Sequence, residues 1–167
     1  MIRGLFVNLP VADLGRSVDF FEALGFSFDP AFTGDNGACL LVSAQNRVML
    51  VAEPFFRTLT RKTPTDTRVH TEVLLSLHCD TRAQVDALVA KALAAGGTVP
   101  GPPEDHGFMY EYGFEDPDGH QWGVFWMKAS APDGPGPQGV AVDDSSSNDS
   151  AFNDSASNDS ALPSQAC

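Results

Sequence analysis

The chain has 167 residues, enough for one domain with a substantial hydrophobic core. Its 22 acidic and 10 basic residues give a formal net charge of −12, which argues against a nucleic-acid partner because phosphate is bound through basic surfaces. We find no apolar run of 18 residues and no signal-peptide pattern, so we expect no membrane partner and a cytoplasmic location.

The composition changes after Lys128. All ten basic residues lie in 1–128, which therefore carries a net charge of −6, whereas 129–167 contains six aspartates and no basic residue. The repeat "SNDSAFNDSASNDSA" (147–161) has a period of five, which fits neither a helix nor a strand. We predict a folded domain over 1–128 and a disordered acidic tail, rich in Ser, Asp and Asn, over 129–167. An acidic interaction tail is the alternative.

The first half, about 2–52, reads as strand, helix and three strands. An apolar strand over 2–11 precedes a helix over 13–26, which Asp13 would cap and Gly25 would end. Short strands follow at "FSFD", "GACLLVS" and "RVMLVA". Residues 53–69 are predicted to be a linker.

The second half, about 71–127, repeats that order. A strand over 71–79 precedes a helix over 80–97, with Asp80 or Thr81 as its cap. Strand-like segments follow at "TVPGPP", "FMYEYGFE" and "HQWGVFWM", the last two joined by the strong turn sequence "DPDG". We therefore predict an α+β fold of two β-α-β-β-β modules, whose curved mixed sheets surround a central cavity suited to a small ligand.

Two segments, "FVNLPVADLGRSVDFFEALGF" and "FEDPDGHQWGVFW", give the chain a resemblance to a known family. The chain resembles the vicinal oxygen chelate superfamily, whose members include glyoxalase I, bleomycin-resistance proteins and extradiol dioxygenases. The resemblance covers residues 2 to about 127 and implies a glyoxalase-like domain that commonly forms homodimers. It does not fix a reaction, because one fold hosts many chemistries.

The resemblance also implies four metal-ligand positions, which metal enzymes of the superfamily fill with His or Glu. In this chain these positions fall on Phe6, Leu50, Glu72 and Gly123. One carboxylate among four cannot hold a catalytic metal, since such sites need two or three convergent protein donors. We therefore expect no cofactor, with a divalent metal as the alternative if a shift in strand register brings Glu53 inward.

Alternation along the strands, the ligand position that the resemblance implies at Leu50 and the loop position of His106 together give a set of residues predicted to line the cavity. These residues are Phe6, Asn8, Leu50, Leu74, Ser76, His106, Gln121, Gly123 and Phe125. The same reasoning leaves open a packed core in which Phe6 fills the space beside Gly123. His106 would lie at the pocket mouth or be a solvated loop histidine, and His120 is predicted to face outward.

Glu72 is the candidate catalytic residue. Facing an apolar cavity, its carboxylate would be desolvated and could act as a general acid or base. The alternative is a structural role, paired with Arg68 or hydrated at the strand end.

These observations lead to one functional hypothesis and two alternatives. The chain would bind a small organic molecule in the central cavity, with the superfamily metal site largely lost. The first alternative is a drug-sequestering protein of the bleomycin-resistance type. The negative charge of the chain would suit a cationic drug. The second is a metal-dependent lyase or dioxygenase, and the sequence leaves open whether the protein is an enzyme at all.

Overall fold

The structure is a computed structural model that describes residues 1–129, which form one compact unit. The predicted tail lies outside the described residues, apart from its first position. The helices and strands, in chain order, are β1 (Leu5–Val11), α1 (Leu14–Leu24), β2 (Ser27–Phe28), the 3-10 helix η1 (Pro30–Phe32), β3 (Gly37–Leu41), β4 (Asn46–Ala52), α2 (Glu53–Leu59), β5 (Leu74–His78), α3 (Arg82–Ala94), β6 (Glu104–Asp105), β7 (Met109–Glu115) and β8 (Gln121–Met127). Among the described helices, none has the length and apolar character needed to cross a bilayer.

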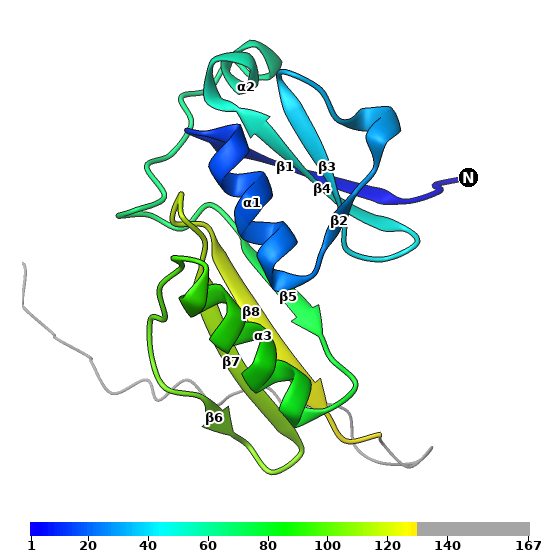
Figure 1. The fold of residues 1–167 in the computed structure, drawn as a ribbon, viewed down its shortest axis with the longest axis vertical. Helices are drawn as coiled ribbons and strands as arrows, with labels where there is room; N and C mark the ends of the chain where they lie inside the picture. The colour runs from blue at the N-terminus through cyan, green and yellow to red at the C-terminus, as the bar shows by residue number, and fades with distance from the viewer. Residues whose placement is uncertain (130–167) are drawn as a thin grey trace, which may run out of the picture. The chain divides into compact units, whose positions relative to one another are not determined.

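The two halves fold into two mixed four-stranded sheets of the same topology (Figure 1). The first sheet has the order β1-β4-β3-β2 and the second β5-β8-β7-β6. The pairs β1–β4 and β5–β8 are parallel, and the other neighbours are antiparallel. In each half a helix connects the first strand to the rest, so the predicted α+β fold of two β-α-β-β-β modules is confirmed.

The helix ends follow the capping signals in the sequence. Asp13 caps α1 by accepting a hydrogen bond from the backbone N–H of Arg16, and Gly25 ends the helix with a φ of 101° that favours glycine. Between the two candidate caps of α3, the structure selects Thr81, which forms a capping box with Gln84.

One hydrophobic core joins the two halves. The Phe21 ring of α1 lies 5.1 Å from Trp122 of β8, and Phe20 lies 6.0 Å from Phe114 of β7. Helices α1 and α3 also contact each other. The helix-bearing faces of both sheets therefore share a buried aromatic centre, in which four aromatic rings account for much of the apolar burial.

The other face of each sheet is open, which corrects the expected central cavity. Phe6 on β1 is 43% exposed and Leu74 on β5 is 67% exposed. The faces predicted to enclose a ligand are thus solvent-accessible within a single chain. The reason is that the helices, and not the opposite faces, fill the space between the halves.

Two local expectations were also wrong. The predicted linker over 53–69 begins with a helix, α2, in which Pro54 occupies the first turn where its missing N–H costs nothing. The strand expected at "TVPGPP" is reduced to a single bridge between Thr98 and Glu115, and the short strand β6 follows it.

Candidate functional site

The turn "DPDG" before β8 ties the second half to the first. Gly119 has a φ of 87°, as the turn requires. The Asp118 carboxylate accepts hydrogen bonds from the backbone N–H of Ala12 (3.0 Å), the Arg16 guanidinium (3.0 Å) and the Ser17 hydroxyl (2.9 Å). The turn is therefore anchored on the start of α1.

Asp116 stiffens the same turn from inside. Its buried carboxylate accepts hydrogen bonds from the backbone N–H groups of Asp118 and His120 and from the indole N–H of Trp122. Burial raises the pKa of this carboxyl, a shift that the nearby His120 and these hydrogen bonds oppose. This carboxylate thus links the turn to the aromatic core.

His120 is buried rather than outward-facing, which corrects the sequence prediction. Its Nε2 lies 2.7 Å from the carbonyl oxygen of Pro10 at the end of β1, and its Nδ1 lies 2.6 Å from the Glu72 carboxylate. Both ring nitrogens therefore face oxygen acceptors. His120 bridges the end of β1 and the segment before β5.

Glu72 consequently lies in a structural contact. It precedes β5 by two residues, and its partner is His120, not Arg68, which pairs instead with Asp66. The proposed catalytic carboxylate is thus at the junction of the halves, where it supports a buried histidine.

On the first sheet, Phe6 and Asn8 share the open face, whereas Leu50 does not. The register pairs Phe6 with Arg47, Asn8 with Met49 and Leu9 with Leu50. Leu50 is fully buried in the core on the helix side. Its predicted placement on the same face as Phe6 was therefore wrong, because a shift of one residue along a strand moves a side chain to the opposite face. The Arg47 guanidinium lies over the Phe6 ring, 5.5 Å from its centre.

A hollow of about 330 Å³ adjoins this face of the first sheet. Asn8 and Met49 form its floor, and Phe32, Phe55 and Leu59 contribute apolar walls from η1 and α2. Its other lining residues are Gly34, Asp35, Asn36, Gly37 and Val51. Sequence reasoning found Asn8 but missed Met49, because it placed the β4 face one residue out of register.

On the second sheet, the predicted lining residues do share one open face. The register pairs Leu74 with Gln121 and Ser76 with Gly123, and the His78 ring stacks on Phe125 with centres 5.0 Å apart. Gly123 also lies opposite Gly113 of β7. The middle of this face therefore carries no side chain on either β7 or β8.

The four superfamily ligand positions do not form a donor set in this structure. Phe6 and Gly123 supply no ligand atom, Leu50 faces the core, and Glu72 contacts His120. The residue of β5 that occupies the open face at the strand start is Leu74, which is also without a donor. The metal that the resemblance implies does not fit these residues.

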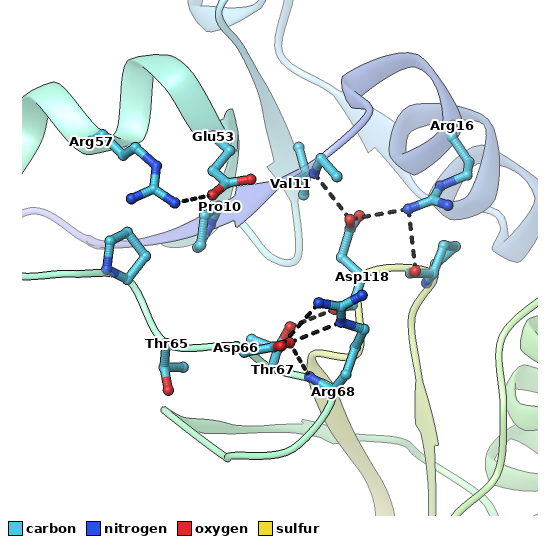
Figure 2. A pocket seen from close by; sticks show the side chains of 13 residues that line it. Pro10, Val11, Arg16, Glu53, Arg57, Thr65, Asp66, Thr67, Arg68 and Asp118 are labelled. Carbon is cyan, nitrogen blue, oxygen red and sulfur yellow. Dashed lines mark hydrogen bonds and ion pairs between the residues drawn. The ribbon is translucent and has the colours of Figure 1, made fainter.

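A larger hollow, about 620 Å³, lies on the linker side and is strongly polar (Figure 2). Three ion pairs line it: Arg16–Asp118, Arg57–Glu53 and Arg68–Asp66. The Arg68 guanidinium holds the pKa of Asp66 below its usual range through side-chain hydrogen bonds. Because each arginine already has a carboxylate partner, the hollow offers no unpaired charge to a ligand.

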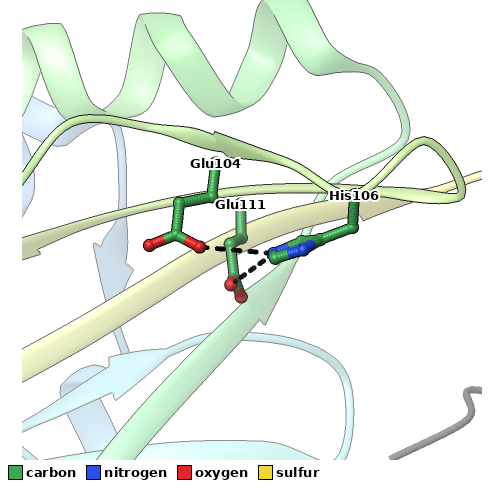
Figure 3. A group of neighbouring side chains, drawn as sticks. All are labelled: Glu104, His106 and Glu111. Carbon is green, nitrogen blue, oxygen red and sulfur yellow. Dashed lines mark hydrogen bonds and ion pairs between the residues drawn. The ribbon is translucent and has the colours of Figure 1, made fainter. Parts of the chain in front are cut away.

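His106 lies on the open side of the second sheet, and Figure 3 shows its imidazole directed toward two neighbouring glutamates that sequence reasoning missed. Its Nε2 is 2.9 Å from Glu111 and 3.7 Å from Glu104. The signal that could have found them is the spacing of Glu104, His106 and Glu111 around a two-residue turn.

Comparison with known proteins supports the resemblance. The family model "Glyoxalase/Bleomycin resistance protein/Dioxygenase superfamily" matches residues 5–124. This chain belongs to that superfamily. The comparison with curated proteins found no match.

Solved structures of similar fold agree with this assignment. A hypothetical protein from S. aureus is 30% identical, covers 76% of this chain and 95% of its own, and has a TM-score of 0.66. A glyoxalase/bleomycin resistance protein/dioxygenase family enzyme from Burkholderia phytofirmans PsJN is 20% identical over 74% of this chain and 97% of its own, with a TM-score of 0.63. A glyoxalase-related enzyme from Fulvimarina pelagi is 20% identical over 72% and 85%, with a TM-score of 0.62. The latter two show the fold alone.

Proposed function

We propose that this superfamily member binds a small organic molecule in the hollow of the first sheet, without a metal at the superfamily positions. The observation that carries the proposal is the 330 Å³ hollow, which has mainly apolar walls and three polar side chains, Asn8, Asp35 and Asn36. An apolar cleft with few polar groups is the usual composition of a small-molecule site.

The donors present support binding without a metal. Phe6, Leu74 and Gly123 offer no ligand atom, and the contact of Glu72 with His120 occupies the remaining carboxylate. A superfamily lyase or dioxygenase reaction would need a different donor set. Binding and sequestration, rather than metal chemistry, therefore account best for the residues present, and the net charge of −12 would favour a neutral or cationic ligand.

The open faces support a homodimer. Phe6 and Leu74 expose apolar surface on the two sheets, and a second copy of the chain could cover both. A dimer would also enclose the hollow, which a single chain leaves open on one side. Light scattering after size exclusion would measure the mass of the full chain, and a monomer at all concentrations would contradict this part of the proposal.

A thermal-shift screen with neutral and cationic aromatic compounds, including glycopeptide drugs, would find ligands. Each hit would then be measured by calorimetry against Phe55→Ala and against Leu93→Ala, which removes a similarly exposed apolar side chain from α3. We expect Phe55→Ala to weaken binding roughly tenfold, given the area of an aromatic wall, and Leu93→Ala to leave it unchanged. Equal affinities for both variants, or binding abolished by chelator, would refute the proposal.

A further inference from the structure

Three metal-ligating side chains meet at the β6–β7 end of the second sheet. The ligand atoms of Glu104, His106 and Glu111 all lie within 4.8 Å of one another. We propose that these residues bind a divalent transition-metal ion, Zn²⁺ foremost, at a position separate from the superfamily ligand slots. The site lies on the other sheet from the hollow proposed for the organic ligand and does not depend on that proposal.

The hairpin brings the three donors together. Glu104 of β6 and Glu111 of β7 are directly opposite partners in the antiparallel register, so their side chains leave the same face of the sheet. His106 follows β6, and its backbone N–H donates to the carbonyl of Met109, which closes the connection. Gly107, with a φ of 79°, permits the turn that directs the imidazole back over the glutamates.

The distances suit one shared ion. The His106 Nε2 lies 2.9 Å from Glu111 Oε1 and 3.7 Å from Glu104 Oε2. Ligand atoms that each lie about 2.0–2.2 Å from a tetrahedral zinc are roughly 3.3–3.6 Å apart. A small rotation of the exposed Glu104 and half-buried Glu111 side chains would therefore place all three atoms around a single centre (Figure 3).

The local negative charge also favours a bound cation. Two carboxylates directly opposite on neighbouring strands repel each other, and neither Glu104 nor Glu111 forms an ion pair with a lysine or arginine among the described residues. Arg82 of α3, which contacts this hairpin, is engaged in a two-bond ion pair with Asp105. Among residues 1–129, His106 is the basic side chain within ion-pair distance of both glutamates.

The donor set indicates the class of metal. One imidazole nitrogen with two carboxylate oxygens suits Zn²⁺ and its first-row neighbours better than Mg²⁺ or Ca²⁺, which favour oxygen alone. Because Glu104 is exposed and Glu111 only half-buried, the remaining coordination positions would be open to water or to an added chelating ligand. Glu111 pairs with Phe125, two residues along β8 from Gly123, so the site is displaced from the superfamily position on the same face.

The test uses the full chain, stripped with chelator and passed over a desalting column. Zn²⁺ affinity and stoichiometry would be measured by competition with a chromophoric indicator, and Mg²⁺ would serve as a comparison. Co²⁺ substitution adds a spectroscopic signature, because nitrogen and oxygen donors give visible d–d bands without the charge-transfer band of a cysteine thiolate. The three variants are Glu104→Gln, His106→Gln and Glu111→Gln, and the matched controls are Glu115→Gln, also on β7, and His70→Gln.

We expect one Zn²⁺ per chain, a loss of affinity of about tenfold or more in each of the three variants, and unchanged affinity in both controls. Circular dichroism would establish that every variant is folded. Binding that survives all three substitutions, a cobalt spectrum with a thiolate band, or equal affinity for Mg²⁺ would overturn the proposal. So would the absence of Zn²⁺ binding by the native chain, in which case His106 serves only as an ion-pair partner.

Discussion

Replacing Asp118 with alanine should separate the turn of the second half from the start of α1. The Asp118 carboxylate is only 9% exposed and accepts from the backbone of Ala12, the side chain of Arg16 and the hydroxyl of Ser17. Each of these bonds joins residues about a hundred positions apart, so their loss acts on the contact between the halves and not on a local turn.

The three partners do not contribute equally. Arg16 is half exposed and remains able to donate to the carbonyl of Pro117, so its ion pair should stabilise by no more than about 1 kcal/mol. Ser17 keeps its second acceptor, the carbonyl of Asp13. The Ala12 amide has no such replacement among the described hydrogen bonds, and losing a charged acceptor costs roughly 1.5–3 kcal/mol. Together, Asp118→Ala should lower the free energy of unfolding by about 2–4 kcal/mol.

Urea denaturation of the full chain, followed by tryptophan fluorescence, would measure this loss. Asp118→Asn should cost much less, because its amide oxygen can still accept from Ala12, and Arg16→Ala should cost less than about 1 kcal/mol. Asp66→Ala removes an exposed carboxylate from the same hollow and should leave the midpoint unchanged. The assignment of the anchor to the Ala12 amide is refuted if Asp118→Ala changes the free energy of unfolding by less than about 0.5 kcal/mol. It is also refuted if Arg16→Ala lowers that free energy as much as Asp118→Ala does.

Three further changes test other parts of the structure. The hydrogen bond to Asp86 raises the pKa of Tyr110 to about 12. In a Tyr112→Phe background, where Tyr110 is the remaining tyrosine, Asp86→Asn should move the ultraviolet titration of the phenol to lower pH. An unmoved titration would contradict that contact. A Cβ at position 123 would lie 3.1 Å from the Ser76 hydroxyl oxygen, so Gly123→Ala should destabilise the native chain by about 0.5–1 kcal/mol. The same change should be nearly neutral in a Ser76→Ala background, because the crowded hydroxyl is then gone. If the costs of the two substitutions simply add, the predicted clash is refuted. Burial raises the pKa of Asp116 in the folded protein above its ordinary 3.8. The carboxyl therefore contributes its full stabilisation to the folded state below pH 3.8, and this contribution is lost as the pH rises through the folded pKa. Asp116→Asn should flatten that part of the curve of unfolding free energy against pH, and an unchanged slope would refute the shift.

The sequence predicted the repeated order of elements because both halves carry strong local signals. The caps Asp13 and Thr81, the stop at Gly25 and the turn ending at Gly119 each depend on a few adjacent residues. Such signals are readable from one chain, since capping and turn geometry are local. They sufficed for the fold class and for the family.

The site was harder to predict, because strand parity and long-range contacts decide it. Leu50 was placed on the wrong face by a register error of one residue, which reverses every side chain on β4. His120 was expected outside, yet its partners, Pro10 and Glu72, are 110 and 48 positions away. No local pattern in "DPDGHQW" indicates those acceptors.

Gly123 lies in a row of small residues that crosses the second sheet. Gly113 is its partner on β7, and Ser76 is its partner on β5, so three adjacent strands carry small residues across the same row. A carboxylate side chain at position 123 would crowd the Ser76 hydroxyl, because a Cβ there would lie 3.1 Å from its oxygen. One row further along the same face, the Glu111–Phe125 pair begins a region with both carboxylate and imidazole donors. Ligand-binding side chains on this face therefore lie at the β6–β7 hairpin end of the second sheet, and not at its centre, where Gly113 and Gly123 pair.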